Sequence, residues 1–142
     1  MDPKLRKIRE RLLYEFPFYS KSALKIRTKS GDIAPLNLNP AQEILQKAVD
    51  DQQKTEGKIR IIILKARQQG LSTYVGGHLY FSVSQNKARK AMVITHHADS
   101  TRALFDMTKR YHENCPEILK PHTKYSSRQR WPRGNNYSLS CL

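Results

Sequence analysis

The sequence predicts an α/β fold: an incomplete parallel sheet with flanking helices, preceded by a small β-hairpin. Two short apolar runs, residues 59–64 and 91–95, have the composition of strands that are buried on both faces of a parallel sheet. Each run is followed by a segment with helical spacing of apolar residues. The order strand, helix, strand, helix is that of a right-handed βαβ crossover.

The first 37 residues predict a lead-in made of one helix and one hairpin. Apolar residues at near-helical spacing indicate a short amphipathic helix over residues 3–15. Residues 23–28 then alternate between apolar and polar side chains, turn-forming residues occupy positions 30–32, and residues 33–36 return as a second strand.

A partial core is expected over residues 38–120. Asn39 is a good helix N-cap and Pro40 suits the first helical position, so a helix begins there and runs to about Asp51. A polar linker over residues 52–58 then leads into the first apolar run.

Helices are expected after both apolar runs, one beginning near Ser72 and one over residues 98–114. Gly76 and Gly77 cost helix stability and indicate close packing against a neighbouring element. Residues 121–142 form a basic tail that we expect to be irregular. The side chains predicted to face inward are Val75, Leu79, Val83, Ala103, Leu104, Met107 and Tyr111, with core packing also explaining Tyr74, Tyr80 and Phe81.

Charge restricts the class of partner. Lys and Arg total 26 against 12 Asp and Glu, and the net charge of +14 favours a polyanion, above all nucleic acid. Lys87, Arg89 and Lys90 are candidates for contact with DNA, although keeping an edge of the sheet soluble explains the same cluster equally well. The sequence has no apolar run of about 18 residues that would span a bilayer, so no membrane partner is expected.

Cysteine and histidine positions do not predict a metal site. Cys115 and Cys141 lie far apart without CxxC spacing, which argues against a disulfide framework or a zinc site and fits a reducing cytosol. His96 and His97 are adjacent after a strand-like run, where neighbouring side chains point to opposite faces and chelate poorly.

One segment has the features of a ligand-binding loop. It is Lys65-Ala-Arg-Gln-Gln-Gly-Leu-Ser-Thr73, between the first apolar run and the next helix. A phosphate-binding loop needs a strand that ends, a glycine that lets backbone N–H groups converge, and a helix N-terminus directed at the anion. Gly70 and Ser72 fit the last positions of the motif G-x-x-x-x-G-K-[ST], whose hydroxyl holds Mg²⁺.

Two positions depart from that motif. Lys65 stands where the motif has its first glycine, and Leu71 stands where it has its lysine. Because phosphoryl chemistry needs a cation near the β- and γ-phosphates, we expect Lys65 to curl back over them, with Arg67 as a second candidate. An ordinary strand-to-helix turn with solvated basic side chains is the alternative interpretation.

The loop resembles the variant Walker A loop of phage terminase large subunits, in which the lysine stands at the start of the loop. Residues 38–42, Leu-Asn-Pro-Ala-Gln, are similar to the adenine-recognition segment of that family. The basic, hairpin-bearing N-terminal part and the strand-helix unit over residues 91–113 are also similar, so that the likeness covers roughly residues 23–128. The resemblance implies a P-loop NTPase-like fold and an ATP- and Mg-dependent motor that moves double-stranded DNA into a capsid.

The resemblance also implies residue roles and partners. Gln42 would bind adenine, Gly70 would shape the loop, and Ser72, with Thr73 as the alternative, would ligate Mg²⁺. The remaining residues expected to bind the nucleotide are Lys65, Arg67, Gln68 and Gln69. The implied partners are double-stranded DNA and, for a full-length protein, the terminase small subunit, the portal and further copies of itself. The implied compartment is the cytoplasm of a bacterial host of a phage or prophage.

No catalytic set is complete in this sequence. Hydrolysis requires a strand that ends in an acidic pair, one carboxylate for Mg²⁺ and one to activate water. Asp99 comes nearest but is better placed to cap the following helix, and Asp106 falls in mid-helix. The resemblance implies that this strand and the nuclease carboxylates would follow residue 142, so we expect no ATP hydrolysis by this chain alone.

Two further classes of function stay open. One is another P-loop or helicase-like nucleic-acid translocase, because an adenine-reading Gln also precedes the phosphate loop in such proteins. The other is a basic DNA-binding module without nucleotide chemistry, in which the net charge of +14 explains the function and the loop is incidental.

Overall fold

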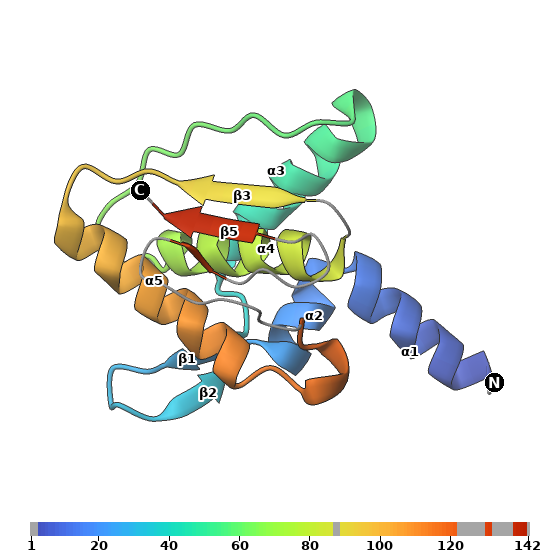
Figure 1. Cartoon of the computed structure of the whole chain (residues 1–142). Coiled ribbons are helices and arrows are strands. Elements are labelled where there is room, and N and C mark those ends of the chain that lie inside the picture. The colour runs from blue at the N-terminus through green and yellow to red at the C-terminus, as the bar shows by residue number, and fades with distance from the viewer. Residues whose placement is uncertain (1–2, 87–88, 122–129, 132–137, 142) are drawn as a thin grey trace.

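The computed structural model of the chain describes residues 3–86, 89–121, 130–131 and 138–141. Within these residues the protein is a mixed α/β fold with five α-helices, an antiparallel pair of strands and a second, small sheet (Figure 1). Helix α4 (Leu71–Gln85) is central, because it contacts α2, α3, α5 and β3. No helix among the described residues is long and apolar enough to cross a membrane.

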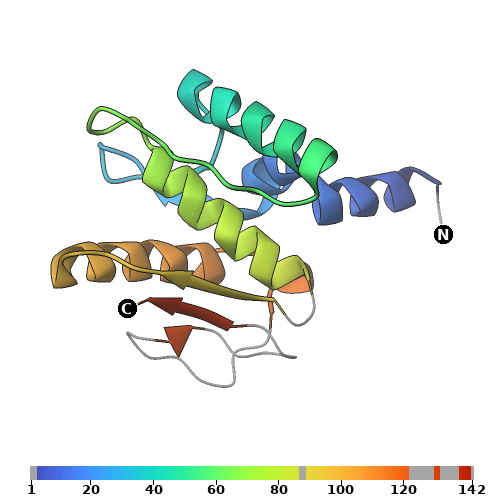
Figure 2. The same cartoon turned by 90° about the horizontal axis from the view of Figure 1, so that it is seen from above.

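The N-terminal part contains the predicted helix and hairpin. Helix α1 (Pro3–Tyr14) projects from the body and buries none of its residues (Figure 2). Strands β1 (Lys25–Arg27) and β2 (Ile33–Pro35) pair antiparallel, which confirms the hairpin.

Between α1 and the hairpin lies a helix that the sequence analysis did not predict, α2 (Phe16–Ala23). It has only eight residues, and two of its first three are aromatic, a composition that weakens the local helical signal. Its buried residues are nevertheless at helical spacing: Phe16, Tyr19, Ser20 and Ala23.

Helix α3 (Pro40–Glu56) begins as predicted, with a capping box. Gln42 N donates to Asn39 Oδ1 at 2.9 Å, and Asn39 N donates to Gln42 Oε1 at 3.0 Å. The predicted end near Asp51 is wrong, because the polar residues that follow are good helix formers and continue the helix. The helix ends at Gly57, whose φ of 67° provides a left-handed C-cap.

The predicted buried strand over residues 59–64 is not formed. The segment runs extended but pairs with no other strand in the described part of the chain. Ile62 is 99% exposed and Leu64 is 101% exposed, so burial on both faces is wrong. The apolar composition indicated a central strand, but a ladder also requires neighbouring strands, and the described residues supply none on either side. The expected βαβ crossover is therefore absent from the described fold.

Helix α4 and its glycines pack as the sequence indicated, but on a different face. Buried residues of this helix are Leu71, Tyr74, Gly77, Tyr80, Phe81 and Val83. Val75 is exposed, so only Val83 of the predicted apolar stripe is fully buried. Gly77 lies against Leu24, which follows α2, and Leu36, which follows β2. A Cβ at Gly77 would lie 3.1 Å from Leu24 Cδ1 and 3.2 Å from Leu36 Cδ2. Close packing at the glycine pair is confirmed.

Helix α5 (Ala98–Glu113) and strand β3 (Lys90–Val93) follow. Tyr111 is fully buried and packs as predicted, whereas Ala103 is exposed, contrary to the prediction. Strand β3 is not buried on both faces, since Met92 is 58% exposed. A single covered face explains the alternation of exposed and half-buried residues along it.

The second sheet involves the tail. Strand β3 pairs in parallel with β5 (Ser138–Cys141), and β5 pairs antiparallel with β4 (Arg130–Trp131). The expected irregular tail is therefore wrong for these two strands. Residues 122–129, 132–137 and 142 lie outside the described residues.

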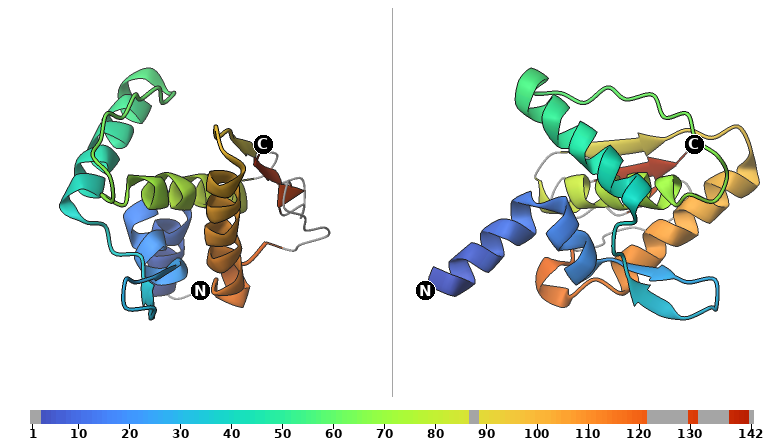
Figure 3. Two further views of the ribbon diagram at one scale, coloured as in Figure 1. Left: turned by 90° about the vertical axis from the view of Figure 1, so that its left-hand side faces the viewer. Right: turned by 180° about the vertical axis from the view of Figure 1, so that it is seen from behind.

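The core joins α2, α4 and α5 through aromatic side chains with satisfied hydroxyls. Tyr19 Oη lies 3.3 Å from Ser84 Oγ, and Tyr80 Oη lies 3.1 Å from His112 Nδ1. Tyr111 Oη donates to the Thr73 carbonyl at 3.1 Å. Burial raises the pKa of all three tyrosines, so these hydroxyls stay protonated, and their hydrogen bonds join the helices. Figure 3 shows α4 between α3 on one side and α5 with β3 on the other.

Candidate functional site: a loop held by the start of helix α3

The loop of residues 65–70 is fastened at its end to the first turn of α3. Gln42 Nε2 donates to the Gly70 carbonyl at 2.7 Å, and Asn39 Nδ2 donates to the Gln69 carbonyl at 3.2 Å. The two segments singled out from the sequence, residues 38–42 and 65–73, therefore lie in direct contact. They meet because the capping box fixes the Gln42 side chain against the helix end, and its remaining amide hydrogens point at the loop.

Gly70 is required at its position for two separate reasons. Its φ of 70° lies in the left-handed region, which side chains other than glycine rarely adopt. A Cβ there would also lie 2.9 Å from Gln42 Nε2 and 3.4 Å from Asn39 Nδ2. The contact with α3 and the turn into α4 thus both depend on a residue without a side chain.

The backbone of the loop alternates in conformation. Gln68 has φ 61° and Gly70 has φ 70°, while φ is not positive at Arg67 or Gln69. Positive φ at every second residue is a feature of the concave backbone nests that bind anions in phosphate loops. Gln68 is the one described non-glycine residue with positive φ, so the chain accepts about 1 kcal/mol of backbone strain there.

The loop leads directly into the positive end of α4. The N-cap residue is Gly70, which offers no side chain to the first N–H groups, and the first turn carries no acidic residue. Because the first four N–H groups of a helix have no partner within it, this end remains able to bind an anion. Tyr111 Oη, bound to the Thr73 carbonyl, anchors the same turn from α5.

The polar residues predicted to bind nucleotide differ in their placement. Lys65, Arg67, Gln68, Gln69 and Ser72 are exposed, and Thr73 is half-buried. Lys65 and Ser72 line one pocket of 180 Å³. The other lining residues are apolar or glycine: Ile63, Leu71, Val75, Gly76, Leu79, Val93 and Leu104. Lys65 and Ser72 therefore line the same pocket, whereas Arg67 and Thr73 do not.

Gln42 is more deeply engaged than the sequence suggested. It is 3% exposed, its Oε1 accepts from Asn39 N, and its Nε2 donates to Gly70. In this conformation the amide positions the loop, and reading an adenine would require it to exchange one of these bonds. The contribution of Asn39 to the loop was not anticipated. Its side chain was recognised only as a cap, although an Asn cap keeps two N–H donors available for a second partner.

The basic candidates for nucleic-acid contact are only partly described. Lys87 lies outside the described residues. Arg89 is exposed and donates to Ser82 Oγ at 3.1 Å, and Lys90 is exposed at the start of β3. No acidic residue occurs in the sequence between Glu56 and Asp99, so the extended segment, the loop, α4 and β3 are all uncompensated by carboxylates along the chain.

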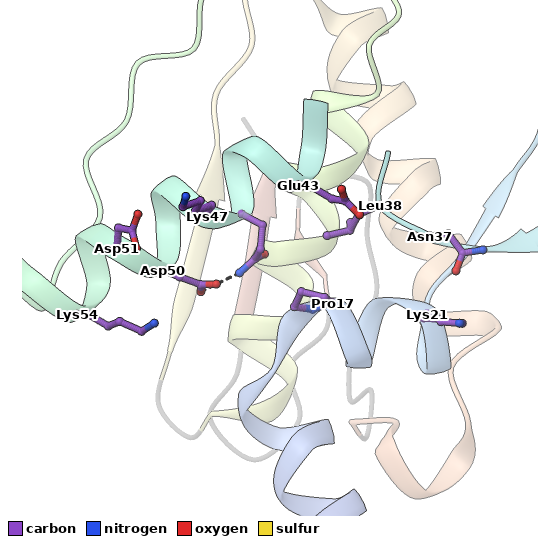
Figure 4. A pocket seen from close by; sticks show the side chains of 10 residues that line it. Pro17, Lys21, Asn37, Leu38, Glu43, Lys47, Asp50, Asp51 and Lys54 are labelled. Carbon is purple, nitrogen blue, oxygen red and sulfur yellow. Dashed lines mark hydrogen bonds between the residues drawn. The ribbon is translucent and has the colours of Figure 1, made fainter. Parts of the chain in front are cut away.

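A larger pocket, of 630 Å³, lies away from the loop (Figure 4). It is formed by α2, residues 37–38 and one face of α3, and its charged side chains are of both signs: Lys21, Lys47, Lys54, Glu43, Asp50 and Asp51. Gln46 Nε2 donates to Asp50 Oδ1 at 2.8 Å within it. None of the residues of the candidate loop lines this pocket, so it is a separate feature.

Asp99 and Asp106, the acidic residues nearest to a catalytic pattern in the sequence, both lie in α5. Asp99 lies in the first turn of α5, with its Oδ1 3.9 Å from Arg102 Nη1, and Asp106 is exposed in the middle of that helix. Among the described residues, no three metal-ligating side chains of His, Cys, Asp or Glu gather in one place.

Comparison with known proteins adds no family to these observations: neither a protein-family model nor a curated protein matches the chain.

Proposed function

We propose that the chain binds the phosphates of ATP, with Mg²⁺, on the loop over residues 65–73. The observation that carries the proposal is the alternating backbone of residues 67–70, which ends at the uncapped N-terminus of α4. Backbone nests and helix N-termini both bind phosphate in proteins, and here the loop with alternating φ leads straight into the helix.

Side chains around the loop fit that ligand. Lys65 shares a pocket with Ser72, so one cation and one hydroxyl line the same space. In the proposed complex Lys65 supports the phosphate charge and Ser72 ligates Mg²⁺, with Arg67 as a second cation. Gln42 and Asn39 hold the loop in the binding conformation through the carbonyls of residues 70 and 69.

In its fuller form the proposal is that this chain is the nucleotide-binding part of a terminase-like motor that translocates double-stranded DNA. It includes a P-loop NTPase-like sheet in which residues 59–64 are the strand before the loop. Support comes from the extended backbone of that segment and from its running in the same direction as β3 (Figures 1 and 2). The net charge of +14 supports DNA as the partner.

Equilibrium binding of a fluorescent ATP analogue in the presence of Mg²⁺ tests the nucleotide claim. Unlabelled ATP and ADP should compete, while adenosine should not, because the loop binds phosphates rather than the base. Lys65→Ala should weaken binding by about tenfold or more, corresponding to at least about 1.4 kcal/mol. Lys29→Ala removes the same charge from the exposed hairpin turn and should change little. Equal losses in both variants would mean that only net charge attracts the nucleotide.

A DNA-binding module without nucleotide chemistry is the second candidate, favoured by the absence of carboxylates between residues 56 and 99. It predicts salt-sensitive binding of duplex DNA that neither Mg-ATP nor Lys65→Ala alters beyond the effect of one charge. A change in DNA affinity on adding Mg-ATP, lost in Lys65→Ala, would favour the motor instead.

A further inference from the structure

The extended segment over residues 59–64 has a backbone without strand partners. Gln52 Nε2 donates to the Arg60 carbonyl at 3.0 Å, and Arg60 N donates to Gln52 Oε1 at 2.7 Å. These two bonds reproduce the pair that a residue exchanges with an antiparallel neighbour. Beyond Arg60, no hydrogen bond of the described residues takes up the backbone groups of residues 61–64. Exposed amides on a β-branched apolar segment are a template for another strand.

The side chains of this segment divide into two sets. Ile59, Ile61 and Ile63 line a 460 Å³ pocket together with residues of α3 and α4. Ile62 and Leu64 are fully exposed on the opposite side. The segment therefore has the alternating, two-sided arrangement of a strand, with one set of side chains facing α3 and α4, although Ile59 and Ile63 remain 41% and 38% exposed.

Strand β3 presents a second free edge. The strand order β3-β5-β4 places it at the border of its sheet. The 180 Å³ pocket lies between Ile63 of the segment and Val93 of β3, with Val75 and Leu79 of α4 as its apolar floor. Both segments run in the same direction over α4 (Figures 1 and 3). A groove with apolar walls is thus bordered by unpaired backbone on both sides.

Charge indicates which strand the groove accepts. Exposed basic residues lie within or next to both segments in the sequence: Lys58, Arg60, Lys65, Arg67, Arg89 and Lys90. No carboxylate occurs in the sequence between residues 56 and 99. A second copy of the same segment would bring these cations against one another, and like charges across a strand pair are destabilising. A strand flanked by Asp or Glu would instead be attracted to both edges.

We propose that the groove between residues 59–64 and β3 binds a β-strand supplied by another polypeptide, with an apolar, β-branched centre and acidic ends. Backbone hydrogen bonds to the segment and to β3 provide the affinity, and the basic border selects the acidic partner. The bound strand covers Val75 and Leu79 of α4, which otherwise line the pocket. The groove includes the pocket that Lys65 and Ser72 line, so the proposed strand site and the proposed phosphate site are neighbours, but strand binding requires no nucleotide.

The test uses the full chain and a synthetic peptide with an alternating Val-Thr centre between Asp- and Glu-containing ends. A second peptide has the same centre between Lys-containing ends. Fluorescence anisotropy should show that the acidic peptide binds more tightly by about tenfold or more, equivalent to about 1.4 kcal/mol. Hydrogen exchange at residues 61–64 and 91–93 should slow in the complex.

Two variants at one exposed position distinguish strand pairing from nonspecific binding of apolar peptides. Ile62→Pro removes one backbone donor and should weaken peptide binding about tenfold, while Ile62→Val keeps the donor and should bind as the parent does. Both should melt as the parent does, because Ile62 is 99% exposed.

Equal binding of the two peptides, no binding, or protection confined to other residues would overturn the proposal. Concentration-dependent dimerisation lost in Ile62→Pro would overturn it in favour of a second copy. Retention of ATP binding in Ile62→Pro distinguishes this outcome from failure of the phosphate loop.

Discussion

The Gln42 side-chain amide donates to the Gly70 carbonyl at 2.7 Å, joining the first turn of α3 to the last residue of the candidate phosphate loop. Gln42 is 3% exposed, so the bond is protected from water. The same side chain closes the capping box with Asn39. One residue therefore sets both where α3 begins and where the loop ends.

Removing this amide should destabilise the protein. Gln42→Ala removes the side-chain donor to the Gly70 carbonyl, which keeps only the Tyr74 N–H, and opens the capping box; together these losses should cost about 1–3 kcal/mol of unfolding free energy. Urea denaturation measures the loss. Gln53→Ala, an exposed position of the same helix, is the control and should change stability little. Equal effects at the two positions would show that the Gln42–Gly70 bond is not stabilising.

Gly70 and Gly57 form a matched pair for separating backbone strain from crowding. Both have positive φ, 70° and 67°, but a Cβ at Gly57 would meet no atom within 4 Å. Gly57→Ala should therefore cost about 1 kcal/mol from its backbone conformation alone. Gly70→Ala should cost measurably more, because its Cβ would also displace Gln42. Denaturant midpoints compare the two, and a Gly70→Ala penalty no larger than that of Gly57→Ala would contradict the contact.

Strain at Gln68 leads to a prediction of the opposite sign. Gln68→Gly relieves the left-handed conformation and should leave stability unchanged or raise it by up to about 1 kcal/mol. Gln69→Gly relieves nothing, because φ is not positive there, and should lower stability by increasing the entropy of the unfolded chain. A larger loss from the change at position 68 than at position 69 would be inconsistent with the described loop.

Two histidines, His112 buried and His78 half-buried, predict a dependence of stability on pH. Burial lowers the pKa of His78 and His112 below their ordinary value of 6.5, the latter helped by Lys120. The folded protein then binds fewer protons than the unfolded chain, so stability is greatest above that value and falls as pH decreases through it. Thermal melts between about pH 7.5 and 5 should show the loss. His112→Gln should reduce the slope, and an unchanged slope in that variant would assign the effect elsewhere.

Elements with strong local signals could be predicted from the sequence. The Asn39-Pro40 start of α3, the hairpin turn and the spacing in α1 and α5 each depend on neighbouring residues alone. Helix α2 lacked such a signal. Its burial is set by contacts with α4. For example, the rings of Phe16 and Tyr74 pack edge-on with their centroids 5.3 Å apart, and such contacts exist only once the chain is folded.

The candidate site was predictable in composition but not in geometry. The spacing of Gly70 and Ser72 before a helix identified the loop, since backbone and dipole requirements are local. The lack of a strand partner for residues 59–64 among the described residues could not be predicted, because the composition of a segment does not reveal its neighbours. The bond from Gln42 to Gly70 depends equally on how α3 packs against α4.

Phosphate binding by the loop is the central claim, and a thermal melt of the purified chain with and without Mg-ATP tests it most directly. A ligand that binds only the folded state adds about 2.7 kcal/mol at a hundredfold excess over its dissociation constant. We predict a higher melting temperature with Mg-ATP for the parent and for Lys29→Ala, and a clearly smaller rise for Lys65→Ala, whose binding is weaker by about tenfold or more. A cooperative melt of the parent at the same temperature with and without saturating Mg-ATP would contradict the claim.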